Sequence, residues 1–165
     1  TGEAYFKVAK NTEHPFVVTA GELEVLVTGT TFGVRAYKDE KDIQTTLESG
    51  QVTVRVEGKS VKLVPNKQVL FNKSTMGLEV RDVDVDLYLA WADGRLVYDN
   101  CPLEKILTDL GRWYNIDVFY SRDELRSYQF SLNMKKHEEF TQVLELIGKT
   151  GEVQFEIKDN TVIVK

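Results

Sequence analysis

Few side chains in this sequence could carry acid–base or metal chemistry. The histidines are His14 and His137, and Cys101 is the single cysteine. The two histidines lie in different halves of the chain, whereas a zinc site built from Cys and His needs several such ligands close together. General acid–base catalysis likewise needs titratable groups held beside one another. The histidines therefore favour ordinary surface or helix-cap roles, and the lone cysteine cannot form an intramolecular disulfide.

A run of aspartates from Asp82 to Asp86 is the other group of potential ligands. Alternating carboxylates open a calcium-binding loop, in which glycine follows at position 6 and a bidentate glutamate at position 12. Leu87 and Asp93 stand at those two positions here, so the run fits a strand with its aspartates toward water better. The sequence also contains no phosphate-binding glycine loop and no nucleophile elbow. We therefore expect no metal, no cofactor and no turnover of a substrate.

The composition is that of a soluble globular protein. Of the 165 residues, 42% are hydrophobic and 28% are charged, as in proteins that bury a core. The formal net charge of −5 argues against a nucleic-acid surface, because binding phosphates needs clustered Lys and Arg. Uncharged stretches such as residues 87–92 are far shorter than the roughly 20 residues of a membrane span. The abrupt start within a patterned segment is typical of a fragment of a longer protein.

Two patterns divide the chain near Leu87. Residues 1–87 are short runs of alternating apolar and polar residues, separated by turn-forming sequences about every ten residues. This spacing is typical of antiparallel strands, so the first domain, 1–87, is predicted to be all-β, with antiparallel sheets in a sandwich-like arrangement. Residues 88–165 contain amphipathic helices between strands, which predicts a second domain of the α+β class.

The second domain has the pattern of a duplication. Helices are expected within residues 99–115 and 138–151, and a shift of 37 positions, from 103 to 140, aligns six apolar pairs. These pairs are Leu103 and Phe140, Ile106 and Val143, Leu107 and Leu144, Leu110 and Ile147, Ile116 and Val153, and Val118 and Phe155. Because the strand after each helix matches too, we expect a duplicated β-α-β unit with its helices on one face of a small sheet.

One glycine interrupts the alternation of the first domain. Residues 28–34 read TGTTFGV, and Gly29 stands between Val27 and Phe32, which belong to apolar faces on either side. Glycine weakens a strand interior, and it often marks a bulge or the close approach of another backbone.

Four segments of the first domain resemble the periplasmic domain of FecR-type anti-sigma regulators. They are GEAYFKVA at 2–9, PFVV at 15–18, LEVLVTGTTFGVRAY at 23–37 and L-x-S-G-Q-V-x-V at 47–54.

The second domain is similar to the C-terminal domain of the same regulators. The matching segments are W-x-D-G-R-L-V-Y at 91–98, PLEKIL at 102–107 and RWYNIDVFY at 112–120. That C-terminal domain in turn resembles the short signalling domain at the N-terminus of TonB-dependent transducers and secretins. The resemblance spans essentially the whole chain.

The resemblance implies a role in cell-surface signalling in a Gram-negative envelope. This chain would be the periplasmic portion of a single-pass inner-membrane protein. Its partners would be the signalling domain of a TonB-dependent outer-membrane transporter and, through a cytoplasmic segment absent from this sequence, an extracytoplasmic-function sigma factor. No cofactor is implied.

The resemblance also gives the interrupting glycine a second interpretation. Some members of the family cut themselves at a Gly-Thr bond, which Gly29 and Thr30 match. A threonine hydroxyl can attack the preceding carbonyl and form an ester that water opens. The structural alternative is a bulge or close packing at Gly29, with Thr30 as an ordinary strand residue.

We expect the second domain to offer an exposed strand edge to the transducer, whose signalling domain would add a strand to it. One candidate edge is the hairpin strand that contains Tyr128, Phe130 and Leu132. The other is the terminal strand with Thr161 and Ile163.

Two other functions stay open. A glycan-binding module would expose a pair of aromatic rings on the first domain. An envelope-assembly domain of the secretin type would form rings in solution.

Overall fold

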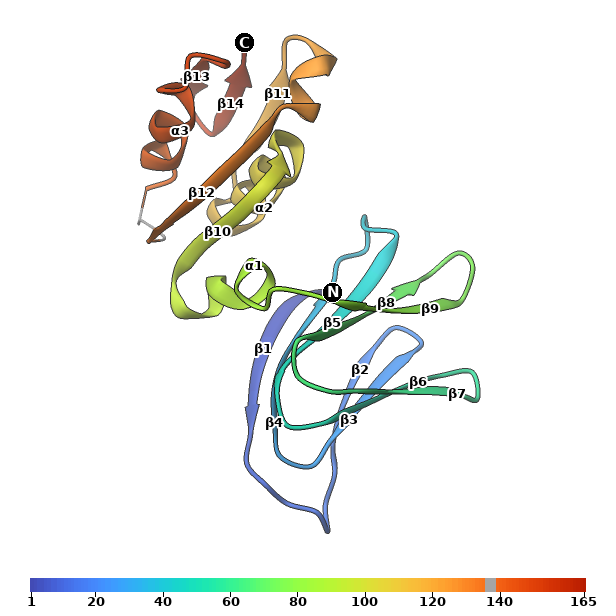
Figure 1. The fold of residues 1–165 in the computed structure, drawn as a ribbon. Coiled ribbons are helices and arrows are strands. Elements are labelled where there is room, and N and C mark those ends of the chain that lie inside the picture. Colours follow the sequence, from blue (N-terminus) through green and yellow to red (C-terminus); the bar gives the residue numbers. More distant parts are fainter. Residues whose placement is uncertain (136–138) are drawn as a thin grey trace. The chain divides into compact units, whose positions relative to one another are not determined.

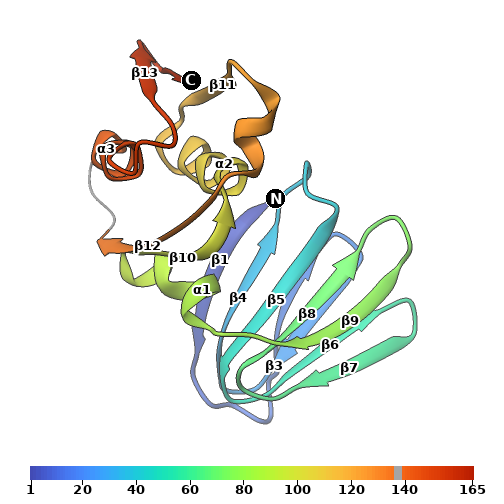
Figure 2. The ribbon, with the colours of Figure 1, turned by 45° about the horizontal axis from the view of Figure 1, so that its top comes forward.

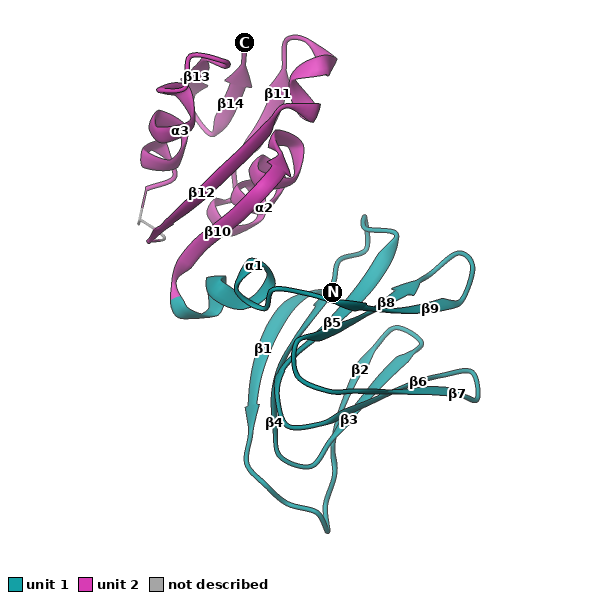
Figure 3. Cartoon of the chain, viewed as in Figure 1, with its two compact units in different colours: residues 1–93 teal, residues 94–165 magenta. Residues whose placement is uncertain are grey.

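The computed structural model (Figure 1) describes residues 1–135 and 139–165, so His137 lies outside the described residues. The chain forms two compact units, Thr1–Asp93 and Gly94–Lys165 (Figure 3). The sequence pattern changes at Leu87, and the short helical segment around this residue belongs to the first unit.

The first unit contains two antiparallel sheets (Figure 2). The five-stranded sheet has the order β1-β4-β5-β8-β9 and the four-stranded sheet the order β2-β3-β6-β7. The strands of the larger sheet are β1 (Gly2–Val8), β4 (Thr30–Ala36), β5 (Asp42–Ser49), β8 (Lys67–Asn72) and β9 (Gly77–Asp82). Those of the smaller sheet are β2 (Phe16–Ala20), β3 (Leu23–Val27), β6 (Val52–Val56) and β7 (Lys59–Leu63).

Alternating side chains build the core between these two sheets. In β3, for example, Leu23, Val25 and Val27 are buried while Glu24 is exposed, as a strand with one buried face requires. Each buried Val, Leu or Phe stabilises the fold by roughly 1.5–3 kcal/mol. The buried hydrophobic residues that share this core are Leu23, Val25, Val27, Phe32, Val34, Ile43, Leu47, Val52, Val54, Val56, Leu63, Val69 and Phe71.

Two helical turns follow β9. They are α1 (Asp86–Leu89) and the 3-10 helix η1 (Ala90–Asp93). The sequence predicts a strand through Leu87 instead, and this prediction is wrong, because β9 ends at Asp82. The carboxylate of Asp84 accepts a hydrogen bond of 3.1 Å from the Asp86 backbone N–H, and such local bonds compete with strand formation.

The α1 segment is fixed to the outer face of the five-stranded sheet. Leu89 lies over Gly33, where a Cβ would be 2.3 Å from the Leu89 Cδ2 atom, so glycine makes room for this contact. Arg81 donates hydrogen bonds of 2.9 and 2.6 Å to Oε1 of the buried Gln68 and one of 3.0 Å to the Tyr88 hydroxyl. A packed leucine and a polar network thus hold this segment.

The second unit contains two smaller sheets and two longer helices. Strands β10 (Arg95–Pro102) and β12 (Gln129–Lys135) form an antiparallel pair. The three-stranded sheet has the order β11-β14-β13, with strands β11 (Asp117–Tyr120), β14 (Thr161–Val164) and β13 (Phe155–Lys158). The helices are α2 (Leu103–Tyr114), the 3-10 helix η2 (Asp123–Ser127) and α3 (Thr141–Gly148).

The expected duplicated β-α-β unit is wrong. Strands β10 and β11, which flank α2, belong to different sheets, and so do β12 and β13, which flank α3. Strand β11 runs parallel to β14, whereas β13 runs antiparallel to it, so the two halves do not repeat each other's pairing. The described chain is mostly strand, with fourteen strands and short helices. The repeated apolar spacing records only which helix faces are buried, because it carries no information on strand partners.

That spacing does identify the core of the second unit. Ile106 and Val143, which the shift aligns, are both fully buried, and so are Leu107 and Leu144 to within 2%. Helix α2 ends at Tyr114 and is capped by Asn115, whose φ of 54° is the left-handed conformation that asparagine tolerates at helix ends. Buried side chains from both sheets and both longer helices meet in one core.

Candidate functional site

Close packing explains the glycine in the interrupted strand. Gly29 has a φ of 146°, a conformation that other residues rarely adopt. A Cβ at this position would lie 2.8 Å from the Cα of Lys10. The neighbouring Asn11 backbone N–H donates a 2.8 Å hydrogen bond to the carbonyl of Thr28, which holds the two segments together. The backbone approach therefore requires glycine, whatever the chemistry of the next bond.

Thr30, which follows Gly29 across the peptide bond, is buried. Its side chain is 4% exposed, and its hydroxyl donates a 2.8 Å hydrogen bond to the carbonyl of Gln51. The chain at Gly50 passes close to the Gly29 carbonyl oxygen, and a Cβ at position 50 would lie 2.5 Å from that oxygen. The bond between Gly29 and Thr30 thus combines an unusual backbone conformation with a hydroxyl that is shielded from water.

A bulge lies just beyond this bond. Thr31 pairs with Ser49 and Phe32 with Leu47, so Glu48 of β5 has no partner in β4. Bulges of this kind bend a strand and increase its twist.

Strand β12 has one open side among the described residues. Its one neighbour in a sheet is β10. Phe130 and Leu132 face the core and are 6% and 8% exposed, while Tyr128 is half-buried just before the strand. The open side of β12 therefore presents backbone groups, and its alternate side chains belong to the core.

The predicted edge at the terminal strand is wrong. Strand β14, with Thr161 and Ile163, lies between β11 and β13 and pairs with both. Its parallel partner β11 precedes it by more than forty residues along the chain, and local patterns do not report such pairings.

A bulge in β10 fixes the register of β12. Asn100 has a φ of 43°, and its backbone N–H donates a 2.8 Å hydrogen bond to Oγ of Ser131. The Ser131 hydroxyl donates to the Asp99 carboxylate at 3.1 Å. These two hydrogen bonds were not predicted from the sequence, although the pair Asp99-Asn100 is a common turn signal.

A buried carboxylate in α2 was also missed. Asp109 is 2% exposed, accepts a 3.0 Å hydrogen bond from the Tyr98 hydroxyl and forms an ion pair with Lys105. Near it, burial raises the pKa of the Cys101 thiol, which disfavours the reactive thiolate. The helical spacing of Lys105 and Asp109, four residues apart, was the available signal.

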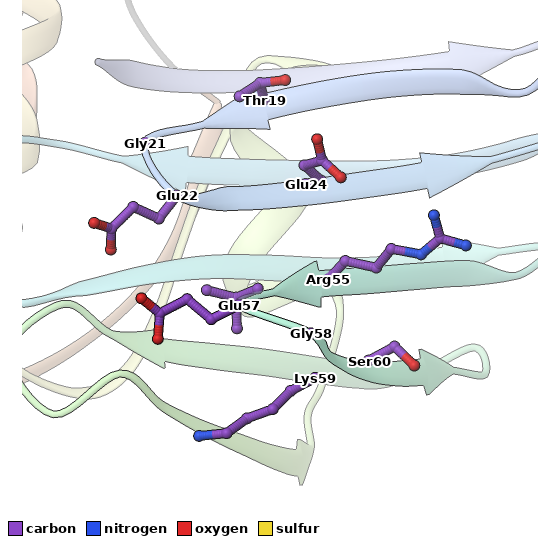
Figure 4. Close-up of a pocket in the computed structure, with 10 residues that line it drawn as sticks. Thr19, Gly21, Glu22, Glu24, Arg55, Glu57, Gly58, Lys59 and Ser60 are labelled. Carbon is purple, nitrogen blue, oxygen red and sulfur yellow. The ribbon is translucent and has the colours of Figure 1, made fainter.

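The first unit has a shallow hollow of about 470 Å³ on the four-stranded sheet (Figure 4). Thr19, Glu24, Arg55 and Ser60 form a row of directly paired residues across its strands. Charges of both signs lie at the hairpin tips beside this row, on Glu22, Glu57 and Lys59. The hollow is a polar surface without an apolar floor, and it gives no particular chemistry.

Other site types find little support in the described parts of the chain. No three His, Cys, Asp or Glu side chains come together there in a way that could hold a metal ion. No helix there is long and apolar enough to cross a membrane. Of the aromatic rings in residues 1–93, Phe16 alone is exposed, whereas a glycan platform needs a pair.

Each of the two units is matched by a protein-family model. The family model described as "FecR protein" matches residues 1–53, and the model described as "FecR, C-terminal" matches residues 95–164. No curated protein matches the chain.

The fold is similar to two crystal structures of a proposed anti-sigma factor from Parabacteroides distasonis ATCC 8503. For one, the sequence identity is 22%, the TM-score is 0.83, and the match covers 99% of this chain and 77% of that chain. For the other, the identity is 23%, the TM-score is 0.82, and the match covers 99% and 76%. At such identities the similarity concerns the fold.

Proposed function

Because this chain belongs to the FecR family of sigma regulators, we propose that it is the periplasmic portion of an inner-membrane anti-sigma factor. It receives a signal from the signalling domain of a TonB-dependent outer-membrane transducer. It thereby controls an extracytoplasmic-function sigma factor through a cytoplasmic segment that lies outside this sequence. The chain acts by binding and turns over no substrate.

The open side of β12 supports this proposal most directly. It presents backbone N–H and C=O groups, and the bulge at Asn100 with the Ser131 bond holds the strand in one register. A strand of the transducer domain adds to this edge, with main-chain bonds supplying affinity. The exposed side chains beside the edge, Gln129, Ser131, Asn133 and Lys135, contribute to selectivity.

The test is a titration of this chain with the signalling domain of the transducer encoded beside its gene, followed by hydrogen exchange. We expect saturable binding and slower exchange of the β12 amides, while the amides of β14, already paired on both sides, change little. Absence of binding would sink the proposed function. Binding that protects other strands instead would retain the function and reject this edge.

We propose in addition that the chain cuts itself once, between Gly29 and Thr30. The Thr30 hydroxyl oxygen attacks the Gly29 carbonyl carbon, the amide C–N bond breaks, and the Thr30 nitrogen takes the hydroxyl proton. Water then hydrolyses the ester. The unusual backbone conformation of Gly29 supports this step, since it is relieved when the bond opens.

Intact mass after incubation tests this step. We expect fragments 1–29 and 30–165 from the natural chain, an uncut Thr30→Ala variant, and cutting as usual in Thr31→Ala, which removes the neighbouring hydroxyl. A full-length mass that stays constant in the natural chain would leave only the packing role of Gly29.

A further inference from the structure

Strand β2 is an edge strand without a charged side chain. It lies at the end of the four-stranded sheet, with β3 as its one sheet neighbour in the described structure. Natural proteins protect edge strands with charged residues, because open backbone groups pair readily with other strands. Each of the other edge strands in residues 1–135 and 139–165 carries at least one Asp, Glu, Lys or Arg, namely β1, β7, β9, β10, β11, β12 and β13.

Apolar side chains are exposed along this edge. Phe16 is 43% exposed and Val17 is 47% exposed. The ring of Phe16 lies 6.0 Å from that of Phe6, which stacks at 5.0 Å on the buried Phe32. The aromatic row therefore runs from the core to the edge, where it ends in a partly solvated ring.

The turn after β2 determines which backbone N–H and C=O groups of β2 bond to β3. Ala20 and Leu23 form the closing pair of the β2–β3 hairpin, with Gly21 and Glu22 between them. The φ of 61° at Gly21 fits a type II′ turn, which has glycine at its first central position. In a hairpin with two turn residues the closing pair exchanges both backbone hydrogen bonds.

Bonded and non-bonded pairs alternate along an antiparallel ladder. Counting back from Ala20, the residues whose backbone bonds to β3 are Ala20, Val18 and Phe16. The N–H and C=O groups of Val17 and Thr19 therefore point to the open side. The edge offers two residues with outward donors and acceptors, spaced as an antiparallel strand requires.

We propose that this edge binds a second copy of the chain, with the two β2 strands antiparallel and a two-fold axis at Val18. Val17 of each copy then lies opposite Thr19 of the other, and each such pair exchanges both backbone bonds, so every outward group is used. A register centred on Val17 would place Thr19 opposite Pro15, which has no N–H, and one centred on Thr19 would place Val17 opposite Gly21 in the turn.

The side chains of β2 also suit an identical strand. In the proposed register Phe16 of one copy lies opposite Ala20 of the other, so a large side chain meets a small one on the core-facing side. Val17 lies opposite Thr19, and both are β-branched residues that favour strands. No like charges meet within the strand pair, because β2 contains none.

Sedimentation equilibrium over a range of concentrations tests this association. We expect the natural chain to form a dimer whose population rises with protein concentration. In Val17→Lys the dissociation constant of the dimer should rise by about tenfold or more, since a charge on an edge strand opposes pairing. Val80→Lys is the matched control, because Val80 is 44% exposed on β9, the edge of the other sheet. It leaves the dimer unchanged.

Hydrogen exchange tests the register without any substitution. Protection of the Val17 and Thr19 amides rises with protein concentration, whereas the Val18 amide, already bonded to β3, keeps its protection. A natural chain that remains monomeric, or amides of Val17 and Thr19 that exchange at the same rate at every concentration, would overturn the proposal. A dimer that Val17→Lys leaves intact would do so as well.

Discussion

The two units join their strands in different ways. In the first unit, β2 pairs with β3, β4 with β5, β6 with β7 and β8 with β9, so most ladders link strands that follow one another along the chain. In the second unit, β10 pairs with β12 and β11 with β14, and each pair spans a helix. Short turns therefore organise the first unit, and contacts distant in sequence organise the second.

This difference decides where local patterns are informative. A turn between two alternating runs names both strands of a hairpin, because the chain has little freedom to choose another partner. A strand that pairs across a helix has several possible partners, and burial in the assembled core selects among them. The first unit should accordingly be the more tolerant of changes in connecting segments.

Shortening a core side chain should give the largest difference in stability between the two units. Leu107 in α2 and Leu47 in β5 are both fully buried, each in the core of its own unit. Leu107→Ala is expected to lower the free energy of unfolding of the second unit by about 2–5 kcal/mol, and Leu47→Ala that of the first by a similar amount. Hydrogen exchange resolved by residue measures both. If either change destabilised both units equally, they would form one cooperative structure.

Filling the space at Gly33 should disturb the first unit alone. A Cβ there would meet Leu89 at 2.3 Å, so Gly33→Ala displaces α1 from the sheet at a cost of about 1–3 kcal/mol. The measurement is chemical denaturation together with exchange of the amides in residues 86–93. The double variant Gly33→Ala with Leu89→Ala is the control, because it makes room for the new methyl group. A double variant that is less stable than Gly33→Ala would contradict this contact.

Acid should weaken the second unit slightly through Glu156. Hydrogen bonds from Lys158 and Lys165 lower the pKa of Glu156 to about 2 from its ordinary 4.5. A carboxyl group with a lowered folded-state pKa contributes stability above its unfolded value, and this contribution is lost as the pH falls from 4.5 through 2. Glu156→Gln should therefore flatten the acid limb of the stability curve measured between these values. An unchanged curve would mean that the exposed ion pairs contribute nothing, as many surface pairs do.

The candidate sites could be predicted only in part. The interruption at Gly29 indicated a bulge or a close backbone approach, and the close approach occurs at Gly29 itself. The nearby bulge lies between Thr31 and Phe32, and its extra residue is Glu48 of β5. The edge at Thr161 could not be rejected from the sequence, because its neighbour β11 is remote in the chain. The contact between Gly33 and Leu89 could not be predicted either, since it joins a strand to a helical turn whose first residues, Asp86 and Leu87, the sequence predicts as the end of a strand.

The sequence by itself determined the buried apolar faces of many strands and helices and the family to which the chain belongs. Alternation and helical spacing depend on one segment at a time, so Leu23, Val25, Ile106 and Val143 could be assigned to cores before any contact was known. Only the tertiary structure decided that β14 is internal and that β2, whose sequence carries no charge, is an edge strand. A strand's neighbours are chosen by the packing of the whole unit, because backbone hydrogen-bonding groups are alike in every strand.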